Sequence, residues 1–370
     1  MSSVLPAALA AALTLTTPLP TPASEWTQPG YGPGATYYNP AETRLTAATV
    51  GSISKRWEIP THGAPDCEIG REPLVAGGNV YTSDPGGVGA YDPATGARRW
   101  HAGLTGRGVT RLAIGDGKLI TLTYACDGQG SFLTAFRSST GQRLWDVPLG
   151  VPAQDMVVDR GVAVVDTRPD FSLSTTAYRL SDGARIWRLT GTRGDGLLSA
   201  GGRLLLRTEG QGSRAVAIST GATLWQTPAN WYAVGSDPAG TRFYVGGAGG
   251  GLTAVNAATG TPIWKSTWPS PSVTADDQRV YLPRYRSVIC LDARTGRKLW
   301  SVHLADAAGQ PVRAGSLLYS PSGLDSPLRI VDAVTGLGLR GGMPSDQNYP
   351  PAVAGGRLFL TDGTRLRAYF

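Results

Sequence analysis

Short runs of apolar residues alternate with turn residues along most of the chain. One stretch reads Leu74-Val75-Ala76, Asn79-Val80-Tyr81-Thr82, Val88-Gly89-Ala90-Tyr91 and Arg98-Arg99-Trp100, with turn residues between the runs. Runs of this length bounded by Gly and Asp indicate β-strands joined by tight hairpins. The pattern therefore predicts four strands, A to D, in one small antiparallel sheet. No apolar period of helical spacing is long enough to predict an α-helix.

This unit returns about every 40 residues, which is the period of four-stranded propeller blades. Each copy carries a Thr-Gly or Asp-Gly pair, and in six copies a Trp follows the Gly by four residues. The Gly supplies a positive φ in the turn from C to D, and the Trp is predicted to pack between blades, with its indole N–H bonded to a neighbouring blade's backbone. The glycines are Gly96, Gly141, Gly183, Gly221, Gly260, Gly296 and Gly336, and the Trp residues are Trp100, Trp145, Trp187, Trp225, Trp264 and Trp300, with Arg340 at the seventh position.

A second recurring turn, between strands A and B, predicts the number of blades. It occurs eight times, from Ala76-Gly77-Gly78 to Ala354-Gly355-Gly356. The chain ends on a strand C that finishes at Phe370, whereas the segment around Trp57 is a strand D without a preceding C. Pairing these two segments closes the ring and removes its exposed sheet edges. The sequence thus predicts an all-β, eight-bladed propeller of four-stranded blades over residues 55–370, preceded by an N-terminal extension at 25–54.

Residues 1–24 differ from the repeats. A short apolar core, a Thr- and Pro-rich stretch and the pair Ala23-Ser24 resemble a secretory signal, although the first basic residue is Arg44. The apolar core is shorter than the roughly 20 residues that a membrane-spanning helix needs. We expect a secreted or extracytoplasmic protein, monomeric and without a membrane span.

The formal net charge of +7 changes this picture little. The basic residues are scattered and form no run or aromatic-basic stripe, so we expect no nucleic-acid partner. An anionic envelope polymer is the partner that the charge itself favours.

The chain has three cysteines, Cys67, Cys126 and Cys290, without a CxxC or Cys/His spacing, so no structural metal site is expected. Cys67 and Cys126 fall in predicted loops on the same face of the ring and are candidates for a disulfide in an exported protein. Cys290 lies in a predicted strand C and is expected to be a buried thiol.

The repeat Ala-x-Asp-x-x-Thr-Gly-x-x-x-Trp, with the opening segments Glu25–Gln28 and Tyr38–Val50, resembles the quinoprotein-type (PQQ-like) propeller repeat family. The family includes pyrroloquinoline-quinone alcohol dehydrogenases and non-catalytic members, such as the propeller subunit of the outer-membrane assembly machinery and external sensor domains of kinases. The resemblance implies, for the enzymes, an adjacent Cys-Cys pair beside the quinone and a calcium ion. This chain has no adjacent cysteines, so the resemblance favours the non-catalytic members and no cofactor.

A ligand site is expected above the central channel, where the loops from D to A and the starts of the inner strands meet. The off-register pair Trp231-Tyr232 suits stacking on a ring or sugar, with packing of its own blade as the alternative. His62 is the one histidine expected on this face, and no GxSxG, HExxH or P-loop motif occurs. The ligand-binding candidates are Glu72, Arg111, Asp155, Asp195, Trp231, Tyr232, Arg313 and Tyr349.

These observations favour a non-catalytic propeller that binds a protein or cell-envelope ligand through its channel-mouth face. Two enzyme alternatives stay open. One is a quinone-dependent oxidoreductase with a degenerate site for PQQ and calcium. The other is a different enzyme with its chemistry at Asp155, Glu72 or Tyr232.

Overall fold

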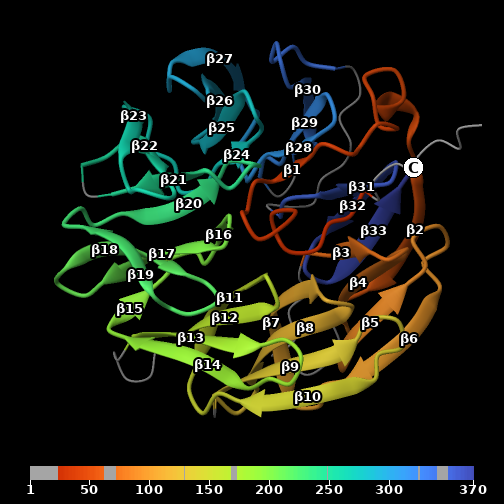
Figure 1. Ribbon diagram of the computed structural model, residues 1–370. Helices are drawn as coiled ribbons and strands as arrows, with labels where there is room; N and C mark the ends of the chain where they lie inside the picture. Colours follow the sequence, from red (N-terminus) through yellow and green to blue (C-terminus); the bar gives the residue numbers. More distant parts are fainter. Residues whose placement is uncertain are drawn as a thin grey trace, which may run out of the picture.

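Eight β-sheets lie radially around a common centre (Figure 1). The computed structural model describes residues 24–61, 72–128, 130–167, 173–247, 249–323, 326–339 and 349–370. Within these ranges the one helical element is the 3₁₀ turn η1 (Val50–Ser52). The predicted all-β, eight-bladed propeller is therefore confirmed.

The first four blades follow one another along the chain. They comprise β3 (Leu74–Ala76), β4 (Asn79–Asp84), β5 (Gly87–Tyr91) and β6 (Arg98–Gly103); β7 (Arg107–Gly115), β8 (Lys118–Ala125), β9 (Ser131–Arg137) and β10 (Arg143–Pro148); β11 (Ala153–Asp159), β12 (Val162–Thr167), β13 (Ser174–Arg179) and β14 (Arg185–Thr190); and β15 (Thr192–Arg193), β16 (Ser199–Ala200), β17 (Arg203–Thr208), β18 (Gly212–Ala217) and β19 (Thr223–Thr227).

The last four blades complete the ring and recruit strands from the N-terminal part of the chain. They comprise β20 (Tyr232–Ser236), β21 (Arg242–Gly246), β22 (Leu252–Asn256) and β23 (Pro262–Ser266); β24 (Thr274–Ala275), β25 (Arg279–Arg284), β26 (Ser287–Asp292) and β27 (Lys298–His303); β28 (Val312–Ala314), β29 (Leu317–Ser320) and β30 (Arg329–Asp332) with β1 (Tyr38–Asn39); and β31 (Ala352–Ala354), β32 (Arg357–Thr361) and β33 (Arg365–Tyr369) with β2 (Lys55–Pro60).

Two blades depart from the regular pattern. In blade four the inner strand is divided into β15 and β16, which both pair with β17, and residues 194–198 loop out between them. In blade seven the fourth strand is β1, which pairs in parallel with the inner strand β28. Arg340, at the Trp position of this blade, lies outside the described residues.

The core lies between neighbouring sheets. A representative cluster joins Tyr244 and Trp264 of blade five to Val280 and Leu291 of blade six, and none of these side chains exposes more than 9% of its surface. Alternate residues of each strand face the neighbouring blade, so each sheet buries both of its faces. Each sequence repeat of about 40 residues therefore forms one blade and one apolar interface with the next blade.

The recurring Trp residues join each blade to the next, as predicted. Each ring also covers the Gly of the Thr-Gly or Asp-Gly pair in the next blade: a Cβ at Gly141 would lie 2.5 Å from Cε3 of Trp100. The φ angles of these glycines lie between 71° and 76°, so Gly is required both for the turn and for the close approach of the ring. The indole N–H groups of Trp57, Trp100, Trp145, Trp187, Trp225, Trp264 and Trp300 donate to the backbone oxygens of Pro93, Ser138, Leu180, Ile218, Ala257, Ala293 and Val334, respectively.

The ring closes as the two ends of the repeat array predicted. Strand β2 pairs antiparallel with β33, with Trp57 opposite Ala368. Glu58 of β2 forms ion pairs with Arg365, with Arg367 (2.8 Å) and with Lys55 (3.2 Å). This clasp makes the eighth blade a sheet built from both ends of the propeller.

The N-terminal extension runs through the centre of the ring and bonds to the inner strands of all eight blades in turn. Trp26, which is 1% exposed, exchanges two backbone hydrogen bonds with Val75 of blade one. The later contacts are Thr27 O with Ile114 N, the Gln28 side chain with the backbone of Val158, Pro33 O with Ser199 N, Gly34 O with Ser236 N, Thr36 O with Ala275 N, Tyr37 O with Arg313 N, and the Asn39 side chain with Val353 O. We call residues 24–42 the central segment.

Candidate functional site

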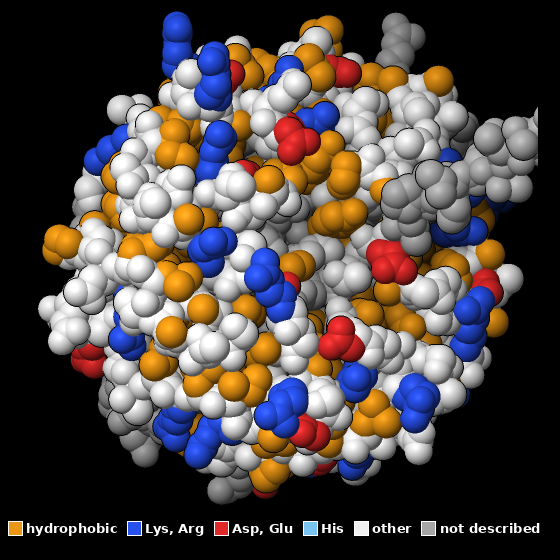
Figure 2. All heavy atoms as spheres, viewed as in Figure 1, with side chains coloured by type: hydrophobic (Ala, Val, Ile, Leu, Met, Phe, Trp, Pro, Cys, Tyr) orange, Lys and Arg blue, Asp and Glu red, His pale blue; other side chains and the backbone are white. Residues whose placement is uncertain are grey.

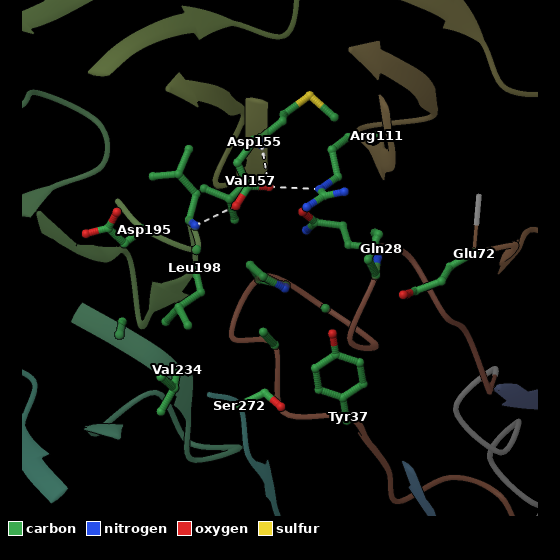
Figure 3. A pocket seen from close by; sticks show the side chains of 18 of the residues that line it. Gln28, Tyr37, Glu72, Arg111, Asp155, Val157, Asp195, Leu198, Val234 and Ser272 are labelled. Atoms are coloured by element: carbon green, nitrogen blue, oxygen red, sulfur yellow. Dashed lines mark hydrogen bonds and ion pairs between the residues drawn. The ribbon is translucent and has the colours of Figure 1, made fainter. Parts of the chain in front are cut away.

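A cavity of about 270 Å³ opens on the face that carries the loops from D to A (Figure 3). The central segment forms part of its wall, so the cavity is a cup and the channel below it is filled. Blades one to five, the loop before blade six and the loop before blade eight supply the other walls. The lining residues are Gln28, Pro29, Gly32, Pro33, Ala35, Tyr37, Glu72, Thr110, Arg111, Asp155, Met156, Val157, Asp195, Gly196, Leu197, Leu198, Ala233, Val234, Pro271, Ser272 and Tyr349.

An ion pair between Asp155 and Arg111 organises one side of the cup. Arg111 Nε donates to Asp155 Oδ1 at 2.8 Å, and the other carboxylate oxygen accepts from the backbone N–H of Leu197 at 2.9 Å. Burial is the largest single effect on the pKa of Arg111 and lowers it, but the charge and hydrogen bond of Asp155, together with Glu72 and Tyr37, outweigh burial and raise that pKa. Asp155 thus ties blade two to the looped-out part of blade four, and both of its oxygens are used structurally.

Three further predicted residues line the same cup. The carboxylate of Asp195 points away from the cavity (Figure 3) and pairs with Arg193 at 3.0 Å and Arg207 at 2.7 Å. The carboxylate of Glu72 points into the cavity in Figure 3, as does the ring of Tyr37. Tyr349 lines the wall on the side of the last blade. The mouth is therefore polar, with more carboxylates than guanidinium groups.

Asp166 lies behind the looped-out residues and is 6% exposed. Its carboxylate accepts from Gly194 N at 2.5 Å and from the Thr175 hydroxyl at 2.8 Å. Burial is the main cause that raises the pKa of Asp166 to about 7, because desolvation penalises the charged form more than these hydrogen bonds favour it. Two carboxylates of blade three, those of Asp155 and Asp166, hold this loop in place.

Three predicted ligand residues lie away from the cup. Trp231 packs against the apolar cluster between blades four and five, with its backbone bonded to the Ser213 hydroxyl, which favours the packing interpretation. Tyr232 packs against the cluster between blades five and six. Arg313 forms an ion pair with Asp276 in a turn from A to B and lies over the ring of Tyr38, on the opposite side of the central segment.

The opposite face has its own cavity, of about 330 Å³, lined by the central segment and the turns from A to B of blades three to five. Gly32 and Pro33 line both cavities. The central segment is therefore the partition between them. Its contributions to the cup, Gln28 and Tyr37, were not among the predicted site residues, because nothing in the sequence placed residues 25–54 inside the ring.

Several other predictions concern single residues. Cys290 is a buried free thiol, as expected. Cys126 is disulfide-bonded; Cys67 lies outside the described residues, as do His62 and residues 1–23, so the Cys67–Cys126 pairing stays a prediction.

The surface chemistry is mixed. On the face shown in Figure 2, Lys and Arg side chains are spread around the ring and form no single stripe. In the parts of the chain that the structure describes, no group of three His, Cys, Asp or Glu residues could hold a metal ion. The same parts contain no helix with the length and apolar character needed to cross a membrane.

Comparisons with known proteins agree with this architecture. A family model described as outer membrane protein assembly factor BamB matches residues 20–189, 130–286, 210–323 and 248–369. A curated BamB of Bordetella pertussis is 25% identical over 297 residues, which cover 74% of this chain and 64% of the relative. The chain thus spans about two thirds of the length of that relative.

Solved structures show the same fold. The crystal structure of BamB from Moraxella catarrhalis superposes with a TM-score of 0.66 at 18% identity, covering 86% of this chain and 97% of that one. A quinohemoprotein alcohol dehydrogenase from Comamonas testosteroni gives a TM-score of 0.68 at 14% identity, covering 94% of this chain and 80% of that one. At these identities the likeness concerns the fold alone.

Proposed function

Since the chain belongs to the family of outer membrane protein assembly factor BamB, we propose that it is a non-catalytic propeller that binds a protein partner in the cell envelope through its channel-mouth face. The names of the family and of its curated relative support an assembly role outside the cytoplasm. The predicted leader points to the same compartment.

The cup at the channel mouth carries this proposal. Its floor is the central segment, and one of its acids, Asp155, has both oxygens occupied by Arg111 and by backbone N–H groups. A catalytic acid or base needs a free position toward a substrate. The same bonds rigidify the loops around the cup, and a rigid polar rim suits protein recognition, because little ordering is needed on binding.

The residues of the cup do not fit a quinone with calcium. The resemblance to the dehydrogenases implies an adjacent cysteine pair beside the quinone, and the sequence has none. The central segment also fills the channel beneath the cup, where it lines both cavities. The proposal therefore includes no cofactor and assigns no catalytic residue, either to this reaction or to other chemistry at Glu72, Asp155 or Tyr232.

Site-specific photocrosslinking in the producing cell tests the proposal. A benzophenone side chain would replace Tyr349 at the cup and, as a matched control, Leu337 in a C to D turn on the opposite face, where it is 69% exposed. We expect a discrete protein adduct from position 349 and none from position 337. An adduct from position 337 alone, or turnover of a substrate by the purified chain, would contradict the proposal.

A further inference from the structure

A cluster of aromatic and basic side chains lies on the rim of the same face, between blades five and six. The guanidinium carbon of Arg284 lies 5.2 Å from the ring centre of Trp268 and 5.5 Å from that of Tyr285. Lys298 Nζ lies 5.7 Å from the Trp268 ring. We call Trp268, Arg284, Tyr285, Arg286 and Lys298 the rim cluster. The loop that carries Trp268 continues into Pro271 and Ser272, which line the cup.

Tyr285 is the unusual member of this cluster. It is 82% exposed and stands at the tip of the two-residue turn between β25 and β26, with a φ of 47°. A side chain in this left-handed region is disfavoured. In the matching turn of blade one, Pro85 stands at this position, and the residue with a positive φ (81°) is the next one, Gly86. An exposed ring adds little to the core, so the fold gives no reason for Tyr at this position.

The turn is held rigidly despite this conformation. Ala308 N donates to Tyr285 O at 2.5 Å, and Leu304 N donates to Arg286 O at 2.8 Å. The Arg286 guanidinium donates to Ala305 O in the same loop. Three hydrogen bonds to residues 304–308 therefore fix the direction in which Tyr285 is presented. Because the backbone that carries the ring is already ordered, binding has to order only the side chain, which lowers the entropic cost.

The charge of the cluster indicates what it recognises. Among the described residues, Arg284, Arg286 and Lys298 form no ion pair with a carboxylate. The adjoining loop, residues 304–311, contains one acid, Asp306. The exposed Tyr285 and Arg286 lie beside the half-buried Trp268 and Arg284. Tyr, Trp and Arg side chains gathered in one place are the composition of interface hot spots. We propose that the rim cluster is a docking site for an acidic protein segment, with Tyr285 as its aromatic anchor.

This inference rests on the proposed function and adds the place and the partner's chemistry. A protein segment suits the cluster better than a membrane surface, because stable adsorption to anionic lipid takes a patch of about four to eight basic residues, whereas this cluster combines three basic residues with two rings in fixed positions. Carboxylates can bind the guanidinium groups in a bidentate manner, and an apolar neighbour can cover Tyr285.

Peptide binding to the purified full chain tests the proposal. The probe is a fluorescein-labelled Glu-rich peptide containing one Leu, and its control is the same peptide with Gln in place of every Glu; anisotropy reports binding. The variants are Tyr285→Asn, because Asn tolerates a positive φ, and Arg284→Glu. Arg297→Glu, an exposed position in the C to D turn of the same blade, makes the same charge change on the opposite face.

We expect the acidic peptide to bind more tightly than the Gln peptide, and each rim variant to weaken it by about tenfold, as for a hot-spot residue. Arg297→Glu should have little effect. Tyr285→Asn should leave the thermal midpoint unchanged or raise it, because a structural role would lower it. No binding to the wild-type chain, equal weakening by Arg297→Glu, or binding of phosphatidylglycerol vesicles that the rim variants abolish would overturn the inference. If the side chain at position 349 forms an adduct but the rim variants do not weaken peptide binding, this inference is overturned and the proposed function is still supported.

Discussion

Substitution of Gly141 by Ala measures how much the contact between Trp and Gly stabilises the junction between blades. Gly141 has a φ of 73°, and an added Cβ would lie 2.5 Å from Cε3 of Trp100 and 2.8 Å from Cδ2. A left-handed residue with a side chain costs about 1–2 kcal/mol. Overpacking adds about 1–3 kcal/mol. We therefore expect Gly141→Ala to lower the free energy of unfolding by about 2–5 kcal/mol.

Gly117→Ala is the matched control. Gly117 belongs to the same blade and has a φ of 68°, but a Cβ there meets nothing within 4 Å, so only the backbone cost of about 1–2 kcal/mol applies. Urea unfolding followed by Trp fluorescence compares the midpoints of the two variants, at an unchanged slope. A Leu in place of Trp100 leaves more room for the added Cβ. Gly141→Ala should therefore lower the free energy of unfolding by less in a Trp100→Leu background than in the wild type. Equal destabilisation by the two glycine substitutions would refute the packing argument.

Three further outcomes follow from the clasp, the cup and the cysteines. Hydrogen bonds from Arg365 and then Arg367 lower the pKa of Glu58 from 4.5 to about 2, so its stabilising effect is present above pH 4.5 and is lost as the pH falls toward 2. Glu58→Gln should therefore be less stable than the wild type at pH 7, with the difference vanishing near pH 2 in thermal melts; a constant difference would count against the ion pairs. Calorimetry with pyrroloquinoline quinone and Ca²⁺ should give no heat of binding at micromolar concentrations, and a saturable signal would revive the oxidoreductase alternative. Non-reducing peptide mapping should recover a Cys67–Cys126 disulfide, and free thiols at both positions would exclude it.

The fold could be predicted because its signal is repeated. Seven of the eight blades pack a Trp against a neighbour, and the turns from C to D of seven blades contain the Gly that the Trp covers, so the same spacing recurs along the chain. The closure of the ring was also predictable, because the sequence around Trp57 matches a strand D that no strand C precedes. Because the Trp–Gly contact recurs in many blades, the sequence shows the same spacing several times over.

The central segment occurs once, and therefore no internal comparison reveals it. Residues 24–42 contact the blades mostly through backbone oxygens, which any sequence supplies. Trp26 was recognisable as an off-register Trp, but its burial against blade one depends on a path that only the structure shows. For the same reason Gln28 and Tyr37 were missed in the cup, whereas Arg111 and Asp155, at the starts of inner strands, were found.

The missing Trp at position 340 has a physical explanation in the clasp. Every recurring Trp covers the Gly of a C to D turn in the next blade, as Trp300 covers Gly336. In the eighth blade β33 and β2 come from opposite ends of the propeller, so no Thr-Gly turn joins them. A Trp in the seventh blade would have no glycine to cover.

The central segment supplies contacts at this same junction. Strand β1 pairs with β28 of blade seven, and two side chains in and just after β1 reach blade eight: Asn39 Nδ2 donates to Val353 O at 2.7 Å, and Glu42 accepts from Gly356 N at 2.8 Å. Asn39 and Glu42 are 0% and 2% exposed, so these bonds are shielded from water. The Trp–Gly contact thus occurs at seven junctions of the ring, and at the eighth the buried polar side chains of the central segment add to the apolar packing between blades seven and eight.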